Sequence, residues 1–272
     1  MADSVQIGLV EAEQVARESV LLKAPNGIQY ASYGETGLPR FDLARMVQAV
    51  PATIANAISR KAYYFVPLAM SDSRSEIHPE DRAAISSPPD GASVSPTMIA
   101  SAYTSALGDQ AICHRNVTLG NVDGVFISTR LLSDRFALAF EFFINIGHAF
   151  VDSAGVSSSF ADLVWRQAVA DVRGETSQDA WENRGLALQA SPSDGKPRID
   201  ERARNDYIDS AFSDAIAIYQ LSLAVDFDYS ELREREYPLL APQALAERLR
   251  HVANLFPPNP NYEFAIRYRR RA

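Results

Sequence analysis

The chain has 272 residues, of which 47% are hydrophobic and 22% are charged, and this composition excludes collagen-like repeats and general disorder. The 26 basic and 34 acidic residues give a net charge of -8, which disfavours binding to nucleic acid or to an anionic membrane surface. A single cysteine, Cys113, excludes an internal disulfide and fits a cytoplasmic location. Four histidines leave little material for a metal site.

No membrane span is expected. The first 25 residues carry several charged side chains and lack the continuous apolar stretch of a signal peptide, so they are interpreted as an amphipathic helix. The most apolar segment, residues 136–151, holds Glu141 and His148 and is shorter than the roughly 20 residues that cross a bilayer.

In the first half of the chain, apolar residues at helical spacing predict a helix over residues 41–62, with a kink at Pro51. A strand is expected over 63–70 and a long Ser/Pro-rich loop over 71–97. Residues 111–119 and 125–129 are predicted to pair as a hairpin, because the Asp-Gly pair at 123–124 favours a turn.

In the second half, cap residues and apolar spacing predict mostly helices. Ser133, the serines at 157–159, Asp200 and Pro242 are expected at helix starts. The expected helices cover 133–152, 157–173, 200–223 and 242–256. Residues 262–268 alternate between apolar and polar side chains, which indicates a closing strand.

These elements predict a helix-rich α+β protein with a small mixed or antiparallel sheet, folded as a single domain over residues 1–272. No composition shift marks a linker between independent domains. The two tryptophans, Trp165 and Trp181, are expected to anchor the core.

A polar stripe runs along the otherwise apolar helix predicted at 133–152. At 100° per residue, its side chains share one narrow face, and they are Asp134, Glu141, Asn145, His148 and Asp152. Burying charge without a partner is costly, so this face must be paired, hydrated in a cleft or bound to something.

Two interpretations of the stripe stay open. In the first, Glu141, His148 and Asp152 form a structural network with arginines, for which the candidates are Arg130, Arg166, Arg173 and Arg202. In the second, the same three residues are catalytic, with His148 as a proton carrier or metal ligand and a carboxylate as its orienting partner.

The stretch Ile144-Asn145-Ile146-Gly147-His148-Ala149 resembles the H-E-I-G-H-A active helix of zincin metallopeptidases, in particular the CAAX-type and heat-shock zinc peptidases. In that family two histidines bind zinc and the glutamate activates water. Here the first histidine is Ile144 and the glutamate is Asn145. Downstream, Phe212-Ser213-Asp214 is similar to the family's E-A-D triplet, with Phe212 in place of the third ligand.

The resemblance spans residues 111–232 and implies a degenerate zincin-like core without a metal site, because a lone histidine cannot hold zinc. It implies a non-catalytic binding or scaffold protein whose cleft takes a peptide, a protein segment or a small molecule, with Asn145 and Asp214 as cleft residues. No cofactor is predicted. The alternative is a small-molecule enzyme that uses Glu141, His148 and Asp152, with or without a divalent metal.

Overall fold

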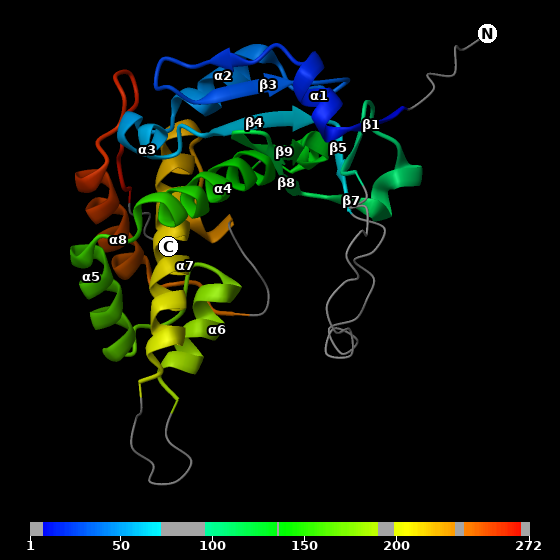
Figure 1. The fold of residues 1–272 in the computed structure, drawn as a ribbon. Coiled ribbons are helices and arrows are strands. Elements are labelled where there is room, and N and C mark those ends of the chain that lie inside the picture. The colour runs from blue at the N-terminus through cyan, green and yellow to red at the C-terminus, as the bar shows by residue number, and fades with distance from the viewer. Residues whose placement is uncertain (1–7, 72–95, 135, 190–198, 232–236, 268–272) are drawn as a thin grey trace, which may run out of the picture. The chain divides into compact units, whose positions relative to one another are not determined.

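The computed structural model describes residues 8–71, 96–134, 136–189, 199–231 and 237–267. It contains helices together with mixed and antiparallel sheets, so the predicted helix-rich α+β class is confirmed (Figure 1). Its backbone contacts divide into two compact units. The first comprises residues 1–24, 28–43 and 59–141, and the second 25–27, 44–58 and 142–272.

The first unit contains a five-stranded mixed sheet in the order β2-β3-β4-β9-β8. The central pairs β3–β4 and β4–β9 are parallel, whereas β2–β3 and β8–β9 are antiparallel. Both β4 and β9 are almost entirely buried, as expected for strands covered on both faces. The strands are β2 (Leu22–Lys23), β3 (Gln29–Ser32), β4 (Lys61–Val66), β8 (His114–Leu119) and β9 (Val122–Ser128).

A four-stranded antiparallel sheet in the order β1-β6-β5-β7 completes the sheet structure described for this unit. Pro67 separates β4 from β5, so the strand predicted at 63–70 is two strands in two sheets. The other elements of the unit are β1 (Leu9–Glu11), α1 (Ala12–Glu18), β5 (Leu68–Met70), β6 (Met98–Ala100), β7 (Ala111–Ile112) and the 3-10 helices η2 (Ser105–Gln110) and η3 (Thr129–Ser133).

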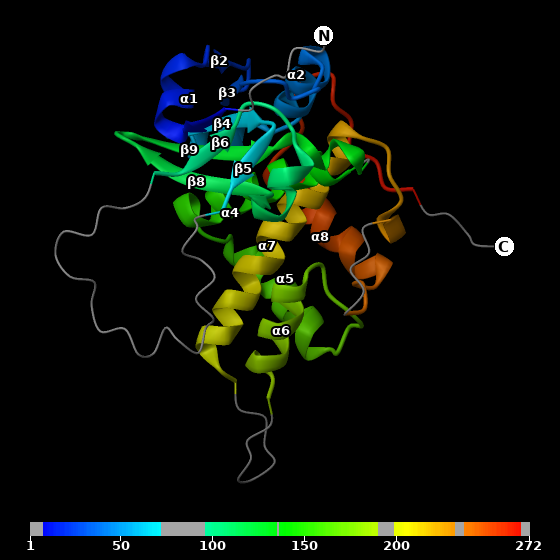
Figure 2. The ribbon, with the colours of Figure 1, turned by 90° about the vertical axis from the view of Figure 1, so that its right-hand side faces the viewer.

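The predicted hairpin is present as β8 and β9 (Figure 2), but its turn lies earlier than expected. Gly120 and Asn121 form the turn, and Gly120 has the positive φ of 62° that such a tight turn requires. Gly124, which was expected in the turn, pairs with Val117 inside the ladder.

The helix predicted over 41–62 is wrong in its extent. It is two short helices, α2 (Arg40–Gln48) and α3 (Ala52–Ala57), separated at Pro51. Proline lacks the N–H group that would continue the hydrogen bonds of the helix. The helix is therefore broken at Pro51, where only a kink was expected. Residues 61 and 62 belong to β4, because their neighbours are β-branched and aromatic residues that pair with β3 and β9.

In the second unit, α5, α6 and α8 pack around the long helix α7 (Figure 1). The caps at Ser157 and Asp200 are confirmed, since each side chain accepts a hydrogen bond from the first turn of its helix. The elements are α5 (Ser158–Val169), α6 (Gln178–Ala187), α7 (Glu201–Ala224), η4 (Tyr229–Glu231) and α8 (Pro242–Leu255).

Helix α6 was not predicted, because three of its ten residues are alanine or glycine and its apolar positions define no clear face. It presents Trp181 to solvent with 37% of the residue exposed. Trp165 is half-buried, and the guanidinium of Arg204 lies 4.8 Å from its ring. The expectation that both tryptophans anchor the core is therefore wrong.

The helix α4 (Ala137–Ala154) runs from the first unit into the second. Its Gly147 lies against the backbone of α7, where an added Cβ would come within 2.5 Å of the Ser213 carbonyl oxygen. Next to this contact, the ring of Phe212 packs against the rings of Phe150 and Phe160. A small residue is required where two helix backbones approach this closely.

The closing strand predicted at 262–268 is wrong for the residues that the structure describes, since 262–267 pair with no strand. The alternation is nevertheless real: Tyr262, Phe264 and Ile266 are half-buried and their neighbours are exposed. The Tyr262 hydroxyl donates to the Arg45 carbonyl at 2.7 Å, and the Phe264 ring contacts Tyr219. Extended backbone packed on helices produces the same period of two.

Most of the loop predicted at 71–97 lies outside the described residues. The single-domain prediction stays a prediction. Among the residues described, none of the helices is both long enough and apolar enough to span a bilayer.

Candidate functional site

The polar stripe of α4 does not form one buried network. The Asp134 carboxylate accepts hydrogen bonds from Phe136 N and Ala137 N at 2.9 and 3.2 Å, so it caps the helix in the role that was expected of Ser133. Glu141 is partly buried and Asn145 is 8% exposed, whereas His148 and Asp152 are exposed. The stripe is therefore buried only in its middle, at Glu141 and Asn145, and is exposed at both ends.

Glu141 pairs with His114, a partner that the sequence did not suggest. Within the first unit, His114 Nδ1 lies 2.5 Å from Glu141 Oε1, with the side chains 38% and 18% exposed. The contact between the carboxylate and Nδ1 orients the imidazole ring. Because β8 and α4 are separate elements, only the fold brings the two residues together.

The positions highlighted by the zincin resemblance lie on two helices that contact each other. Gly147 of α4 packs on Ser213 of α7, which directly follows Phe212. Ile144 and Phe212 nevertheless offer no metal-binding atom, and within the described ranges no group of three or more His, Cys, Asp or Glu residues could hold a metal ion. These side chains do not fit a zinc ion held by three protein ligands.

Asp214 is buried rather than exposed in a cleft. It is 4% exposed and accepts a hydrogen bond from the Thr176 hydroxyl at 2.8 Å. Burial raises the pKa of this carboxyl from 3.8 to about 6, although hydrogen bonds from Ser177 and Thr176 oppose the rise. Asp214 and Asn145 were both expected to line a cleft, but Asp214 is a buried, bonded group.

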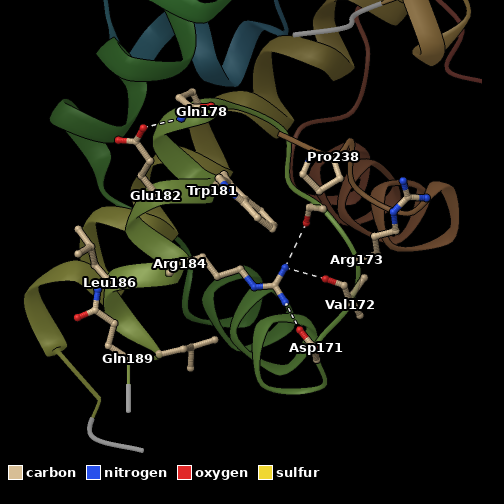
Figure 3. Close-up of a pocket in the computed structure, with 13 residues that line it drawn as sticks. Asp171, Val172, Arg173, Gln178, Trp181, Glu182, Arg184, Leu186, Gln189 and Pro238 are labelled. Atoms are coloured by element: carbon tan, nitrogen blue, oxygen red, sulfur yellow. Dashed lines mark hydrogen bonds and ion pairs between the residues drawn. The ribbon is translucent and has the colours of Figure 1, made fainter. Parts of the chain in front are cut away.

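A groove in the second unit lies between α6 and the segment that precedes it (Figure 3). Its volume is about 880 Å³, within the range of small-molecule sites. The Trp181 side chain extends from α6 towards Pro238, beside the Arg184 guanidinium (Figure 3). The groove is lined by Asp171, Val172, Arg173, Gly174, Gln178, Trp181, Glu182, Arg184, Gly185, Leu186, Leu188, Gln189 and Pro238.

Arg184 holds one wall of the groove in place. Its guanidinium donates to the carbonyl oxygens of Val172 at 2.7 Å, Gly174 at 3.2 Å and Ala168 at 3.3 Å. It also lies 3.4 Å from a carboxylate oxygen of Asp171. Since a guanidinium has five N–H donors, these bonds occupy most of its capacity. Arg184 is therefore a structural residue that fixes the backbone of residues 168–174.

A buried ionic network lies behind this wall. Glu175 and Arg248 are fully buried and form a two-pronged ion pair, at 2.9 Å for Nη1–Oε2 and 3.3 Å for Nη2–Oε1. The Tyr207 hydroxyl donates to Glu175 at 2.7 Å, and Arg248 Nε donates to Gln167 Oε1 at 2.8 Å. Arg184 also reaches Glu175, at 3.4 Å. The network therefore connects the groove wall to α7 and α8.

Sequence reasoning missed this network, although one signal was available. Arg248 lies at helical spacing between Leu245 and Val252, on the apolar face of α8. A charged residue on such a face requires a buried partner. Glu175 carried no comparable signal, because it lies in a connecting segment that pairs with Leu239 only in the folded chain.

In comparisons with known proteins, no family model, curated protein or solved structure matches the chain. The zincin-like core therefore stays a prediction, as do the catalytic roles of Glu141, His148 and Asp152.

Proposed function

We propose that the protein is a binding protein whose groove beside α6 holds a peptide or a small ligand. The observation that carries this proposal is a groove of about 880 Å³ that is lined by a partly exposed tryptophan and has a wall fixed by Arg184. Trp181 offers a large apolar face, and tryptophan is enriched among the residues that dominate binding energy.

The chemistry of the lining favours binding over catalysis in this groove. Its described side chains include no histidine, cysteine, serine, threonine, tyrosine or lysine. Asp171 is paired with Arg184, and the Glu182 carboxylate accepts a hydrogen bond from Gln178. The groove therefore offers no hydroxyl, thiol, amine or imidazole nucleophile, and both of its carboxylates already have a partner, so its chemistry favours holding a ligand in place.

The wall is fixed before any ligand arrives, which reduces the entropy that binding must overcome. Arg184 and the buried Glu175–Arg248 pair both maintain the conformation of the segment that forms this wall. This rigidity supports the proposal of a binding or scaffold protein. The support does not depend on the resemblance to zincins.

Two probes test the groove: a displayed library of random peptides, and the aromatic anion 8-anilinonaphthalene-1-sulfonate. Trp181→Ala removes the apolar face and is expected to weaken binding of the selected probe by about tenfold or more. Gly185→Trp fills the groove and is expected to have the same effect, because an added Cβ at Gly185 meets no atom within 4 Å.

Val169→Ala is the matched control, since Val169 is an exposed apolar residue of the same unit outside the groove lining. It is expected to leave the dissociation constant unchanged. Binding that survives both Trp181→Ala and Gly185→Trp would contradict the proposal and would assign the ligand to another surface.

A second function is favoured by the His114–Glu141 pair. A carboxylate-bound histidine with a solvent-accessible ring is suited to general acid–base chemistry on a small molecule. In this candidate active site, the partner of Glu141 is His114 and not His148 or Asp152, which the sequence suggested. A screen of chromogenic hydrolase substrates tests it: any turnover should fall about 100-fold in His114→Gln. Turnover that is unchanged in this variant would reject it.

A further inference from the structure

A serine and a histidine from different helices of the second unit meet at the surface. Ser159 Oγ, at the start of α5, lies 2.9 Å from His251 Nε2, near the end of α8. Ser159 is exposed and His251 is partly buried, so the serine is accessible to a substrate. One side of the imidazole contacts the ring of buried Phe160, with centroids 5.9 Å apart, and this contact restricts the ring's orientation.

The distance between Ser159 Oγ and His251 Nε2 is short enough for the histidine to activate the hydroxyl as a nucleophile. A serine is a weak nucleophile by itself, and a histidine nitrogen within about 2.6–3.2 Å can remove its proton during attack. Hydrogen bonding through Nε2 is also the arrangement in serine hydrolases of unrelated folds, where geometry rather than sequence position defines the pair.

The helix start supplies donors for the charge that develops on the substrate. The Ser157 cap accepts the Phe160 N–H through its side chain at 3.3 Å, and its carbonyl accepts the Ala161 N–H at 3.0 Å. The N–H groups of Ser158 and Ser159 have no acceptor among the described residues. Such first-turn amides, aided by the helix dipole, stabilise an oxyanion.

From this geometry we infer that Ser159 and His251 form a nucleophile–base pair that reacts with small activated carboxylic esters. Ser159 Oγ bonds to the acyl carbon while His251 Nε2 takes the hydroxyl proton. The bond to the leaving alcohol then breaks, and His251 returns the proton to that oxygen. Water, deprotonated by His251, releases the acyl group as a carboxylic acid and restores the serine.

The pair differs from a full triad, because no carboxylate of the described chain forms an ion pair with His251. The orienting acid normally fixes the imidazole tautomer. Phe160 restricts the orientation of the His251 ring, but it does not determine which ring nitrogen carries the proton. The expected reaction is therefore slow. Covalent labelling is therefore a better readout than turnover.

The test uses the full chain and diisopropyl fluorophosphate, which forms a bond to a reactive serine oxygen and releases fluoride. Mass spectrometry with fragmentation should place the label on Ser159. Ser159→Ala should abolish labelling at this position, and His251→Gln should slow it about 100-fold, the usual contribution of a general base. Ser210→Ala is the control, because Ser210 is a partly exposed helical serine whose hydroxyl donates to the Asp206 carbonyl instead of contacting a histidine.

Each variant is compared with the native chain by thermal unfolding, so that loss of fold is distinguished from loss of reactivity. No label on Ser159, or a label whose rate is unchanged in His251→Gln, would overturn the inference. Neither result would affect the groove proposal.

Discussion

At the residue scale, Asp214 makes the stability of the protein depend on pH. Its pKa is about 6 in the folded chain, against an ordinary value of 3.8, because burial disfavours its charged form. Between these values the folded chain binds more protons than the unfolded chain, so stability falls as pH rises from about 4 to about 6. Above pH 6 the cost is on the order of 3 kcal/mol.

Asp214→Asn should remove this cost while keeping an acceptor for the Thr176 hydroxyl. The variant is expected to be more stable than the native chain at pH 8, by up to about 3 kcal/mol, and to gain little at pH 4. Urea unfolding at both pH values measures the difference. An equal effect at the two pH values would show that Asp214 does not titrate in this range.

Substitutions of Arg248 test how much the buried network behind the groove contributes to the free energy of unfolding. Arg248→Ala leaves the Glu175 carboxylate with Tyr207 and a longer contact to Arg184, and it is expected to cost about 3–5 kcal/mol. The double change Glu175→Gln with Arg248→Met removes both charges and should cost much less. If the double variant is the less stable of the two in urea, the ion pair contributes net stability and the desolvation argument fails.

The residues that could be read correctly from the sequence were those with local roles. Ser157 and Asp200 were predicted as caps because a cap depends only on its own helix. Glu141 was selected as an unusual buried acid, but His114 is 27 positions away, on a strand. Ion pairs between distant elements leave no periodic pattern, so the sequence did not suggest this partner.

At the element scale, two glycines in helices have opposite consequences. Gly147→Ala would push a methyl group to within 2.5 Å of the Ser213 carbonyl oxygen and force α4 and α7 apart. It is expected to destabilise the protein by about 1–3 kcal/mol, the usual cost of overpacking. Gly185→Ala meets no neighbour and should stabilise α6 by up to about 1 kcal/mol.

Thermal unfolding of the two single variants checks both predictions, namely that Gly147→Ala lowers the stability of the protein and that Gly185→Ala raises it. A stable Gly147→Ala variant would show that α4 and α7 can separate without penalty, which would contradict the close contact at Ser213.

Elements were predictable where periodicity and caps agreed. Helices α5, α7 and α8 lie where they were expected because apolar spacing and start signals coincide. Helix α6 lacked a clear face, and the extended segment at 262–267 imitated a strand because helices bury its alternate side chains. The groove lies beside α6, a helix that the sequence did not indicate, so it could not have been predicted.

At the scale of the whole molecule, the two compact units are interleaved in the sequence. The chain passes between them several times, and α2 and α4 each continue from one unit into the other. A helix propagates cooperatively, so melting one half of α4 removes hydrogen bonds that support the other half. This connectivity favours the predicted single cooperative domain, in which neither unit unfolds alone.

The chain carries natural reporters that test this prediction. Both tryptophans, Trp165 and Trp181, belong to the second unit, and the sole cysteine, half-buried Cys113, belongs to the first. Tryptophan fluorescence and the reactivity of the Cys113 thiol with a disulfide reagent are therefore measured across the same urea series. We expect the two transitions to share one midpoint, as two-state unfolding requires. Exposure of Cys113 at a clearly lower urea concentration than the fluorescence change would instead define two independent domains, because the strands around Cys113 would then open while the helices around α7 remain folded.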